Sequence, residues 1–269
     1  MSEPTHSRSP FSERENADFS LPRVVYGRNP VKELLETETR IDRIFLKRGE
    51  REGFLTVLAA KALEKRIPIS EADKSKLDKM AEGGNHQGVV ALVSPVDFLT
   101  LDRLEEQTRA EGKEPFFVLL DGIEDPHNFG AIARSCECAG VNGLILPRHR
   151  TAPLSAVAAK ASAGALAHLP IARVANLTAA IKQLQSHGVW VYAAEASGEY
   201  YGAADLSGPI AFVFGSEGSG VSRLVLETSD KTISIPLHGK VNSLNVSAAA
   251  AVILFAAEKC RSERASQQE

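Results

Sequence analysis

A loop rich in small polar side chains stands directly before a long apolar run near the C-terminus. Residues 238–247 are HGKVNSLNVS, and residues 248–257 continue as AAAAVILFAA. Ser243 and Asn245 can both cap the free N–H groups at the start of the helix that the apolar run predicts, but one of them is enough for that role. The surplus polar groups, held at the end of a rigid helix, therefore predict donors and acceptors positioned for a ligand.

A second loop, in FVFGSEGSGVSRLV, brings three glycines between a predicted strand and a predicted helix. Gly215, Gly218 and Gly220 lack side chains, which lets a ligand approach the backbone as in nucleotide-binding turns. The spacing GxxGxG is not the dinucleotide fingerprint, and the loop lacks the lysine of a P-loop. Glu217 can place a carboxylate against a cationic or hydroxyl-bearing ligand.

A third loop, in LLDGIEDPHNFGAIARSCECAG, connects a predicted strand to a helix whose start is marked by Pro126 and Asn128. Arg134 falls outside the stripe expected to be buried, which comprises Phe129, Ile132, Cys136 and Ala139. Asn128 could be only a helix cap and Arg134 only a surface cation. A helix N-terminus beside a guanidinium is alternatively a docking point for a phosphate or a ribose.

These three loops belong to a region whose strands are short, nearly continuous apolar runs separated by helical patterns. Such runs are typical of a parallel sheet buried on both faces, in the α/β class. Ligands of such sheets gather at the carboxyl ends of the strands, where the three loops lie. The predicted strands are residues 116–120, 143–147, 169–174, 189–194, 210–214 and 232–236.

The 269 residues suffice for two modest domains. Residues 1–20 are polar and are expected to form a disordered tail. Residues 21–97 alternate short strands and helices as one small α/β unit. Residues 98–115 are interpreted as a charged linker, residues 116–260 as the larger domain, and residues 261–269 as a polar tail.

Charge and cysteine usage narrow the class of protein. Residues 21–80 hold 14 Lys or Arg against 10 Asp or Glu, a local excess in a chain with a net charge of −3. A solvated surface explains this excess as well as an RNA-binding face does.

The longest apolar run is far shorter than the roughly 18 residues that a membrane span needs. Three cysteines without a CxxC pair or a histidine cluster predict no metal site and favour a reducing cytoplasm.

Three sequences, DPHNFGAIARS, FVFGSEGSGVS and IPLHGKVNSLNVSAAAAVILF, resemble in order and spacing the motifs of the SpoU (TrmH-like) RNA ribose 2'-O-methyltransferases of the SPOUT superfamily. The resemblance covers residues 116–259. Residues 24–95, with VVYGRNPVKELLE and GGNHQGVVALV, are similar to the L30e-like substrate-binding domain of the RlmB-type 23S rRNA guanosine methyltransferases.

The resemblance implies a parallel sheet with a deep trefoil knot, S-adenosylmethionine as the cofactor, a homodimer, and RNA as the substrate, with a guanosine of 23S rRNA as the target. It places the cofactor contacts at Gly215, Ile235 and Leu244, with Glu217, Gly218 and Leu237 close by. It places the catalytic set at Asn128, Arg134, Glu217, Ser243 and Asn245. Arg134 is the proton acceptor in proposals for the family, but the weak acidity of a guanidinium group favours a role as a phosphate clamp.

Other functions fit parts of the same sequence. Within the family, the substrate could be tRNA, or the enzyme could be a resistance-type rRNA methyltransferase. From a different class, the chain could be an RNA-binding protein without activity, although every expected catalytic position is filled. A nicotinamide-dependent Rossmann enzyme fits poorly because the glycine-rich loop follows the fifth strand and has a different spacing.

Overall fold

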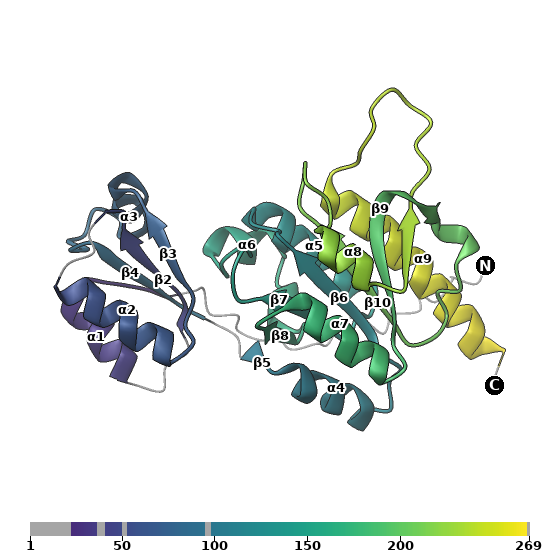
Figure 1. The fold of residues 1–269 in the computed structure, drawn as a ribbon, viewed down its shortest axis with the longest axis horizontal. Helices are drawn as coiled ribbons and strands as arrows, with labels where there is room; N and C mark the ends of the chain where they lie inside the picture. The colour runs from purple at the N-terminus through teal and green to yellow at the C-terminus, as the bar shows by residue number, and fades with distance from the viewer. Residues whose placement is uncertain (1–22, 37–40, 50–52, 95–97, 268–269) are drawn as a thin grey trace, which may run out of the picture.

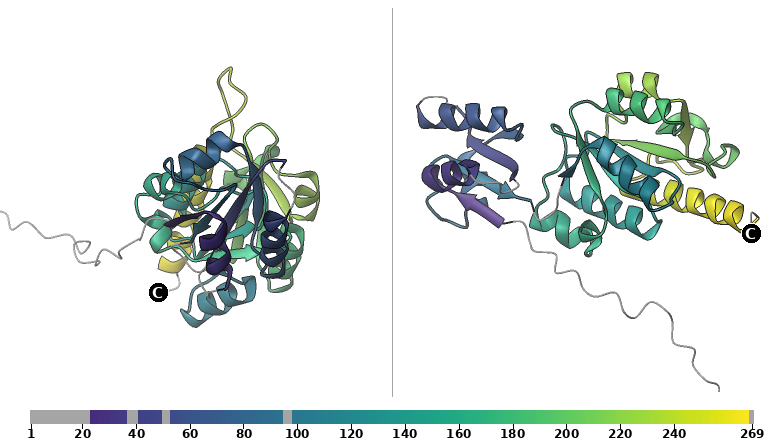
Figure 2. Two further views of the ribbon diagram at one scale, coloured as in Figure 1. Left: turned by 90° about the vertical axis from the view of Figure 1, so that its left-hand side faces the viewer. Right: turned by 90° about the horizontal axis from the view of Figure 1, so that it is seen from below.

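A computed structural model describes residues 23–36, 41–49, 53–94 and 98–267, so the tail expected at residues 1–20 lies outside the described residues. The described chain forms two α/β units, each built on its own sheet, that lie end to end along the long axis of the molecule (Figures 1 and 2). Among the described residues, no helix combines the length and the apolar character that crossing a bilayer requires.

The N-terminal unit is a four-stranded sheet with the order β1-β4-β2-β3. Its elements are β1 (Arg23–Tyr26), α1 (Arg28–Glu36), β2 (Ile41–Lys47), α2 (Phe54–Glu64), β3 (Ile69–Ala72), α3 (Lys74–Met80) and β4 (Val89–Val93). Alternate residues of β4 enter different cores: Val89 and Ala91 pack with α1 and α2, whereas Val90 and Leu92 pack with Leu77 of α3. Helices therefore cover both faces of this sheet, which explains the mainly apolar strands.

The larger unit is a seven-stranded sheet with the order β11-β9-β10-β6-β7-β8-β5, in which every strand pair is parallel. Its strands are β5 (Phe98–Leu99), β6 (Phe116–Asp121), β7 (Gly143–Pro147), β8 (Ile171–Val174), β9 (Trp190–Tyr200), β10 (Ile210–Gly215) and β11 (Lys231–Ser234). Its helices are α4 (Leu101–Ala110), α5 (Pro126–Cys138), α6 (Ala156–Ala161), α7 (Leu177–Ser186), α8 (Arg223–Thr228) and α9 (Val246–Ser266). The predicted parallel α/β sheet is confirmed; the trefoil knot stays a prediction.

The two faces of the larger sheet are read from alternate residues of its central strands. Phe212 and Phe214 of β10 face the core that includes residues of α5, α6 and α9, whereas Ala211 and Val213 face the core that includes residues of α4, α7 and α8. The predicted stripe is buried at all four positions, which are Phe129, Ile132 and Cys136 of α5 and Ala139 directly after it.

The structure differs from the expectation of a linker at residues 98–115. β5 pairs with β8 as the edge of the larger sheet, and Leu101 and Leu104 of α4 are buried in its core. The segment looks like a linker in sequence because the buried face of α4 also contains Glu105 and Thr108. The Glu105 carboxylate is 2.7 Å from His187 Nδ1 and accepts a hydrogen bond from Gln183 Nε2 at 2.8 Å. The tail predicted at residues 261–269 is also wrong in part, because α9 continues to Ser266. The division into domains otherwise stays a prediction.

A buried ion pair joins the two units. Asp42 of β2 is fully buried and pairs with Arg173 of β8, and a second Arg173 nitrogen donates to the Asp42 carbonyl at 2.9 Å. The other Asp42 carboxylate oxygen accepts from the Leu154 N–H at 3.1 Å. The adjacent Arg43 donates to the Thr151 carbonyl at 2.9 Å. Burial lowers the pKa of Arg173, and the Asp42 carboxylate opposes that shift.

We expect Asp42→Ala to destabilise the protein by about 3–5 kcal/mol, because it leaves the buried Arg173 without its carboxylate. The control is Asp73→Ala, which removes a carboxylate that lies 3.5 Å from Arg48 at the surface. That change should cost less than about 1 kcal/mol. Urea unfolding followed by circular dichroism measures both, and equal losses would contradict a special role for the buried pair.

Candidate active site

Three side chains that the sequence places far apart meet where the parallel strands end. The Asn128 amide donates to Glu217 Oε1 at 3.1 Å. The Asn245 amide nitrogen donates to Asn128 Oδ1 at 2.9 Å and also to Glu217 Oε1. Three of the five predicted catalytic residues therefore form one hydrogen-bonded triangle, which joins the start of α5, the glycine loop and the start of α9.

Asn245 serves this triangle and its own helix at once. Its side-chain oxygen caps α9 by accepting from the N–H groups of Ser247 at 3.0 Å and Ala248 at 3.4 Å. Its side-chain nitrogen is thereby directed to Asn128 and Glu217. One end of the Asn245 amide thus caps the helix, as expected, and the other end contacts the polar side chains of Asn128 and Glu217.

One of the two interpretations of Asn128, that it is only the cap of α5, is wrong. Asp125, and not Asn128, caps this helix by accepting from the N–H groups of His127 at 3.3 Å and Asn128 at 3.1 Å. Because Asp125 provides the cap, the Asn128 side chain remains available for the triangle.

The glycine loop is fixed by backbone contacts at its base. The N–H groups of Ser216 and Gly220 donate to each other's carbonyls at 3.1 and 2.9 Å. A Cβ atom on Gly215 would lie 2.0 Å from the backbone of Gly220, so no side chain fits there. Gly218 has a φ of +90° and nothing within 4 Å of where its Cβ would be, so this part of the backbone is open.

A cleft of about 710 Å³ lies between the glycine loop, β9, β11 and the loop that precedes α9. It is lined by all six predicted cofactor-binding residues and by Ser243 and Asn245 of the predicted catalytic set. The six are Gly215, Glu217, Gly218, Ile235, Leu237 and Leu244. In Figure 1 the loop from β11 to α9 projects from the body of the larger unit above this edge of the sheet.

Glu195 is a lining residue that the sequence analysis did not identify. β11 pairs with Ala193 of β9 and then with Glu199, so residues 194–198 form a bulge on β9. Ala194, Glu195 and Ala196 of this bulge line the cleft. Glu195 directly follows the apolar run VWVYAA, so its sequence signal is the one that marked the three loops, a polar residue just after a predicted strand.

The charge of the cleft is one-sided. Among the described residues that line it, Glu195 and Glu217 are carboxylates and none is Lys, Arg or His. Ile235, Leu237, Leu244 and Ile253 supply apolar wall. The cleft therefore suits a ligand with cationic and apolar parts, whereas a polyphosphate would meet repulsion.

The structure does not bring Arg134 to this group. Arg134 is exposed on α5, and among the described residues it makes no hydrogen bond to the triangle. Ser243 lines the cleft but does not cap α9. The part of the chain that the structure describes contains no group of three His, Cys, Asp or Glu side chains placed to hold a metal ion.

Comparison with known proteins gives two family matches. The model described as the SpoU rRNA methylase family matches residues 115–255, and the model described as RNA 2'-O ribose methyltransferase substrate binding matches residues 24–99. A protein of Staphylococcus haemolyticus, provisionally named a TrmH family tRNA/rRNA methyltransferase, is 42% identical over 236 residues, covering 86% of this chain and 93% of the relative. A similarly named protein of Bacillus subtilis is 38% identical over 232 residues, with the same coverage.

Solved structures with the same fold cover most of the chain. The SpoU methyltransferase AviRb of Streptomyces viridochromogenes, in complex with AdoMet, aligns with a TM-score of 0.57 at 24% identity, covering 90% of this chain and 91% of that one. An AdoMet-bound rRNA methyltransferase of Sinorhizobium meliloti aligns with a TM-score of 0.56 at 25% identity, covering 88% of this chain and 87% of that one.

We expect Asn245→Ala to lower the free energy of unfolding by about 1 kcal/mol, because α9 loses its cap. Asn176 is a matched control: it caps α7 by accepting from two N–H groups and a hydroxyl, as Asn245 does at α9. Asn176→Ala should cost a similar amount, measured by urea unfolding. If Asn245→Ala lowered the free energy of unfolding by several kcal/mol and Asn176→Ala did not, the triangle would be needed for the stability of the fold and would not be only a functional site.

Proposed function

Because the chain belongs to the SpoU rRNA methylase family, we propose that it transfers a methyl group from S-adenosylmethionine to a ribose 2'-hydroxyl of RNA. The observation that carries the proposal is the cleft with its triangle. It brings the expected cofactor residues together with Asn128, Glu217 and Asn245 at one edge of the sheet.

The cleft fits S-adenosylmethionine in size, lining and charge. A volume of about 710 Å³ is in the range of small-molecule sites. The apolar side chains suit an adenine ring, and the carboxylates of Glu195 and Glu217 suit a ligand that carries a sulfonium and an ammonium group. The open backbone at Gly218 gives the ligand access to main-chain donors and acceptors. The AdoMet-bound structure from Sinorhizobium meliloti supports the same choice.

The residues around the cleft align the reaction and stabilise its charge. S-adenosylmethionine supplies an activated methyl group. Asn128, Glu217 and Asn245 fix one another, so the edge of the cleft that faces the RNA keeps one geometry, as alignment of two reactants requires. We assign Arg134 to hold a phosphate beside the target ribose and to stabilise the negative charge that develops on the 2'-oxygen.

We assign the RNA substrate to large-subunit rRNA, with a guanosine as the target. The choice of a 23S rRNA guanosine rests on the resemblance of residues 24–95 to the RlmB-type substrate-binding domain. The family models, described as SpoU rRNA methylase and as RNA 2'-O ribose methyltransferase substrate binding, support an RNA substrate. The relatives' names include both tRNA and rRNA, so tRNA is the second candidate.

Methyl transfer from tritium-labelled S-adenosylmethionine to 23S rRNA fragments, with tRNA in parallel, tests this assignment. Asn245→Ala should lower the rate about 10²- to 10³-fold, as loss of one well-placed electrostatic group does. Asn176→Ala, with the same cap lost elsewhere, should keep the wild-type rate. No methylation of either RNA by a protein that binds S-adenosylmethionine would overturn the proposed activity, and methylation of tRNA alone would overturn the rRNA assignment.

We further propose a homodimer that uses α9. Val252 is 39% exposed and Phe255 is 48% exposed on this helix, three residues apart and so on one side of it. The sequence predicts a helix apolar nearly all round, and Val252 and Phe255 are its large apolar side chains that the chain itself leaves exposed. α9 packs against α5, the helix that carries the exposed Arg134, and we place Arg134 near the partner subunit in this dimer. Arg134 would then serve the cleft of the partner subunit.

Phe255→Glu should convert the dimer to a monomer, because it places a charge in the apolar contact. The monomer should still bind S-adenosylmethionine but should lose methyl transfer, since its Arg134 no longer reaches a partner's cleft. Leu63→Glu on α2, where the leucine is 66% exposed, is the control and should stay dimeric and active. Sedimentation velocity at micromolar concentration measures the assembly. A wild-type monomer, or an active Phe255→Glu monomer, would contradict this arrangement.

A further inference from the structure

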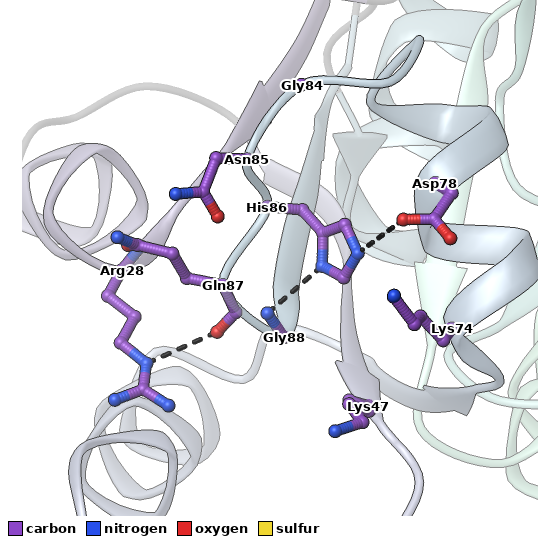
Figure 3. A pocket seen from close by; sticks show the side chains of 9 residues that line it. All are labelled: Arg28, Lys47, Lys74, Asp78, Gly84, Asn85, His86, Gln87 and Gly88. Atoms are coloured by element: carbon purple, nitrogen blue, oxygen red, sulfur yellow. Dashed lines mark hydrogen bonds and ion pairs between the residues drawn. The ribbon is translucent and has the colours of Figure 1, made fainter.

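The N-terminal unit contains a hollow of about 560 Å³ to which the reaction assigns no role. It lies beside the glycine-rich loop 84–88 (Figure 3). Three cations line it: Arg28 at the start of α1, Lys47 at the end of β2 and Lys74 at the start of α3. This charge is opposite to that of the cofactor cleft, so the hollow suits an anionic group such as a phosphate.

The one carboxylate among the described lining residues is already used. His86 is 7% exposed, and its Nδ1 accepts from the Gly88 N–H at 3.0 Å. The ring proton is therefore on Nε2, which donates to Asp78 Oδ1 at 3.0 Å. This pair ties the loop to α3 and directs the Asp78 carboxylate to His86, as Figure 3 shows.

The same loop positions Arg28. The carbonyl oxygen of Gln87 accepts from Arg28 Nε at 3.2 Å, and its side-chain oxygen accepts from the Arg28 N–H at 2.9 Å. Gln87 adopts a φ of +49°, a left-handed conformation that costs free energy in a residue with a side chain. The Asn85 amide lines the hollow as well and offers both a donor and an acceptor.

An aromatic ring lies on a neighbouring side of the loop. A second hollow of about 610 Å³ is lined by Tyr26 and Met80 and shares Gly84 with the first. A Cβ atom on Gly84 would lie 2.4 Å from the Tyr26 hydroxyl oxygen, so the ring lies directly against the loop backbone. Tyr26 is 39% exposed, which leaves ring surface accessible to a base.

Phosphate-binding cations, amide groups and an exposed aromatic ring gathered around one short loop are the combination that recognises unpaired RNA, whose bases can stack on side chains. We propose that loop 84–88 binds a single unpaired nucleotide of the RNA substrate. Arg28, Lys47 and Lys74 hold its phosphate, and Tyr26 stacks on its base. The proposal rests on the proposed function in taking RNA as the substrate, and adds where and in which form the N-terminal unit binds it.

The test uses the full-length protein and a fluorescent single-stranded RNA octamer of mixed sequence, with an RNA duplex of the same length as competitor. Lys74→Gln and Arg28→Gln should each weaken octamer binding about fivefold or more and lower the salt dependence by about 0.7 in log K against log salt. Lys79→Gln, on the same helix but outside the hollow, should change binding less than twofold.

The aromatic contact has its own matched pair. Tyr26→Leu should weaken octamer binding about fivefold or more, because base stacking on the ring is lost. Tyr200→Leu is the control, since Tyr200 is also exposed and also lies against a glycine, Gly202. Binding of S-adenosylmethionine, measured by calorimetry, should be unchanged in all five variants and shows that the larger unit is intact.

The other possible results distinguish failure of this site from failure of the proposed function. Equal losses for Lys74→Gln and Lys79→Gln would show diffuse surface charge and no pocket. A duplex that competes as well as single strands, or a wild-type protein that does not bind the octamer, would overturn the proposal. A protein that binds the octamer as expected but methylates no RNA would leave the nucleotide site standing and overturn the proposed function instead.

Discussion

The site depends on one amide side chain at the start of α9. Asn245 can hold the glycine loop and the start of α5 only because its oxygen is engaged by the helix N-terminus and its nitrogen is thereby directed outward. The parallel sheet makes this possible by bringing the ends of β6, β10 and β11 to one edge. Asn128 and Asn245, which are 117 positions apart in the chain, thus become direct hydrogen-bond partners.

The two places where ligands are expected to bind carry opposite charges. The cleft of the larger unit holds two carboxylates and no cation among its described lining residues, whereas the hollow of the N-terminal unit holds three cations and a carboxylate engaged by His86. A polyanion such as RNA is disfavoured in the first and favoured in the second. The net charge of −3 for the whole chain hides this division.

Sequence patterns predicted the parts of the fold that are buried on both faces. The strands of the larger sheet are continuous apolar runs because helices cover both sides, and such runs are legible without a structure. α4 was misread since the carboxylate on its buried face is satisfied by His187, 82 residues away. Glu195 was missed because the bulge that places it arises from how β9 pairs with β11, which no local pattern encodes. The pairing of Asp42 with Arg173, 131 residues apart, was beyond sequence reasoning for the same reason.

That last pair also bears on how the two units cooperate. A flexible linker would let an RNA bound to one unit adopt many positions relative to the cleft of the other, and each would have to be restricted at a cost in entropy. Asp42 instead takes contacts from both Arg173 and Leu154, and Arg43 reaches Thr151, so several buried bonds span the junction. A buried charge pair adds little stability over apolar packing, but it tolerates few geometries. The junction is therefore better suited to fixing an orientation than to adding stability, and a fixed orientation is what an enzyme needs when one unit binds the RNA and the other performs the reaction.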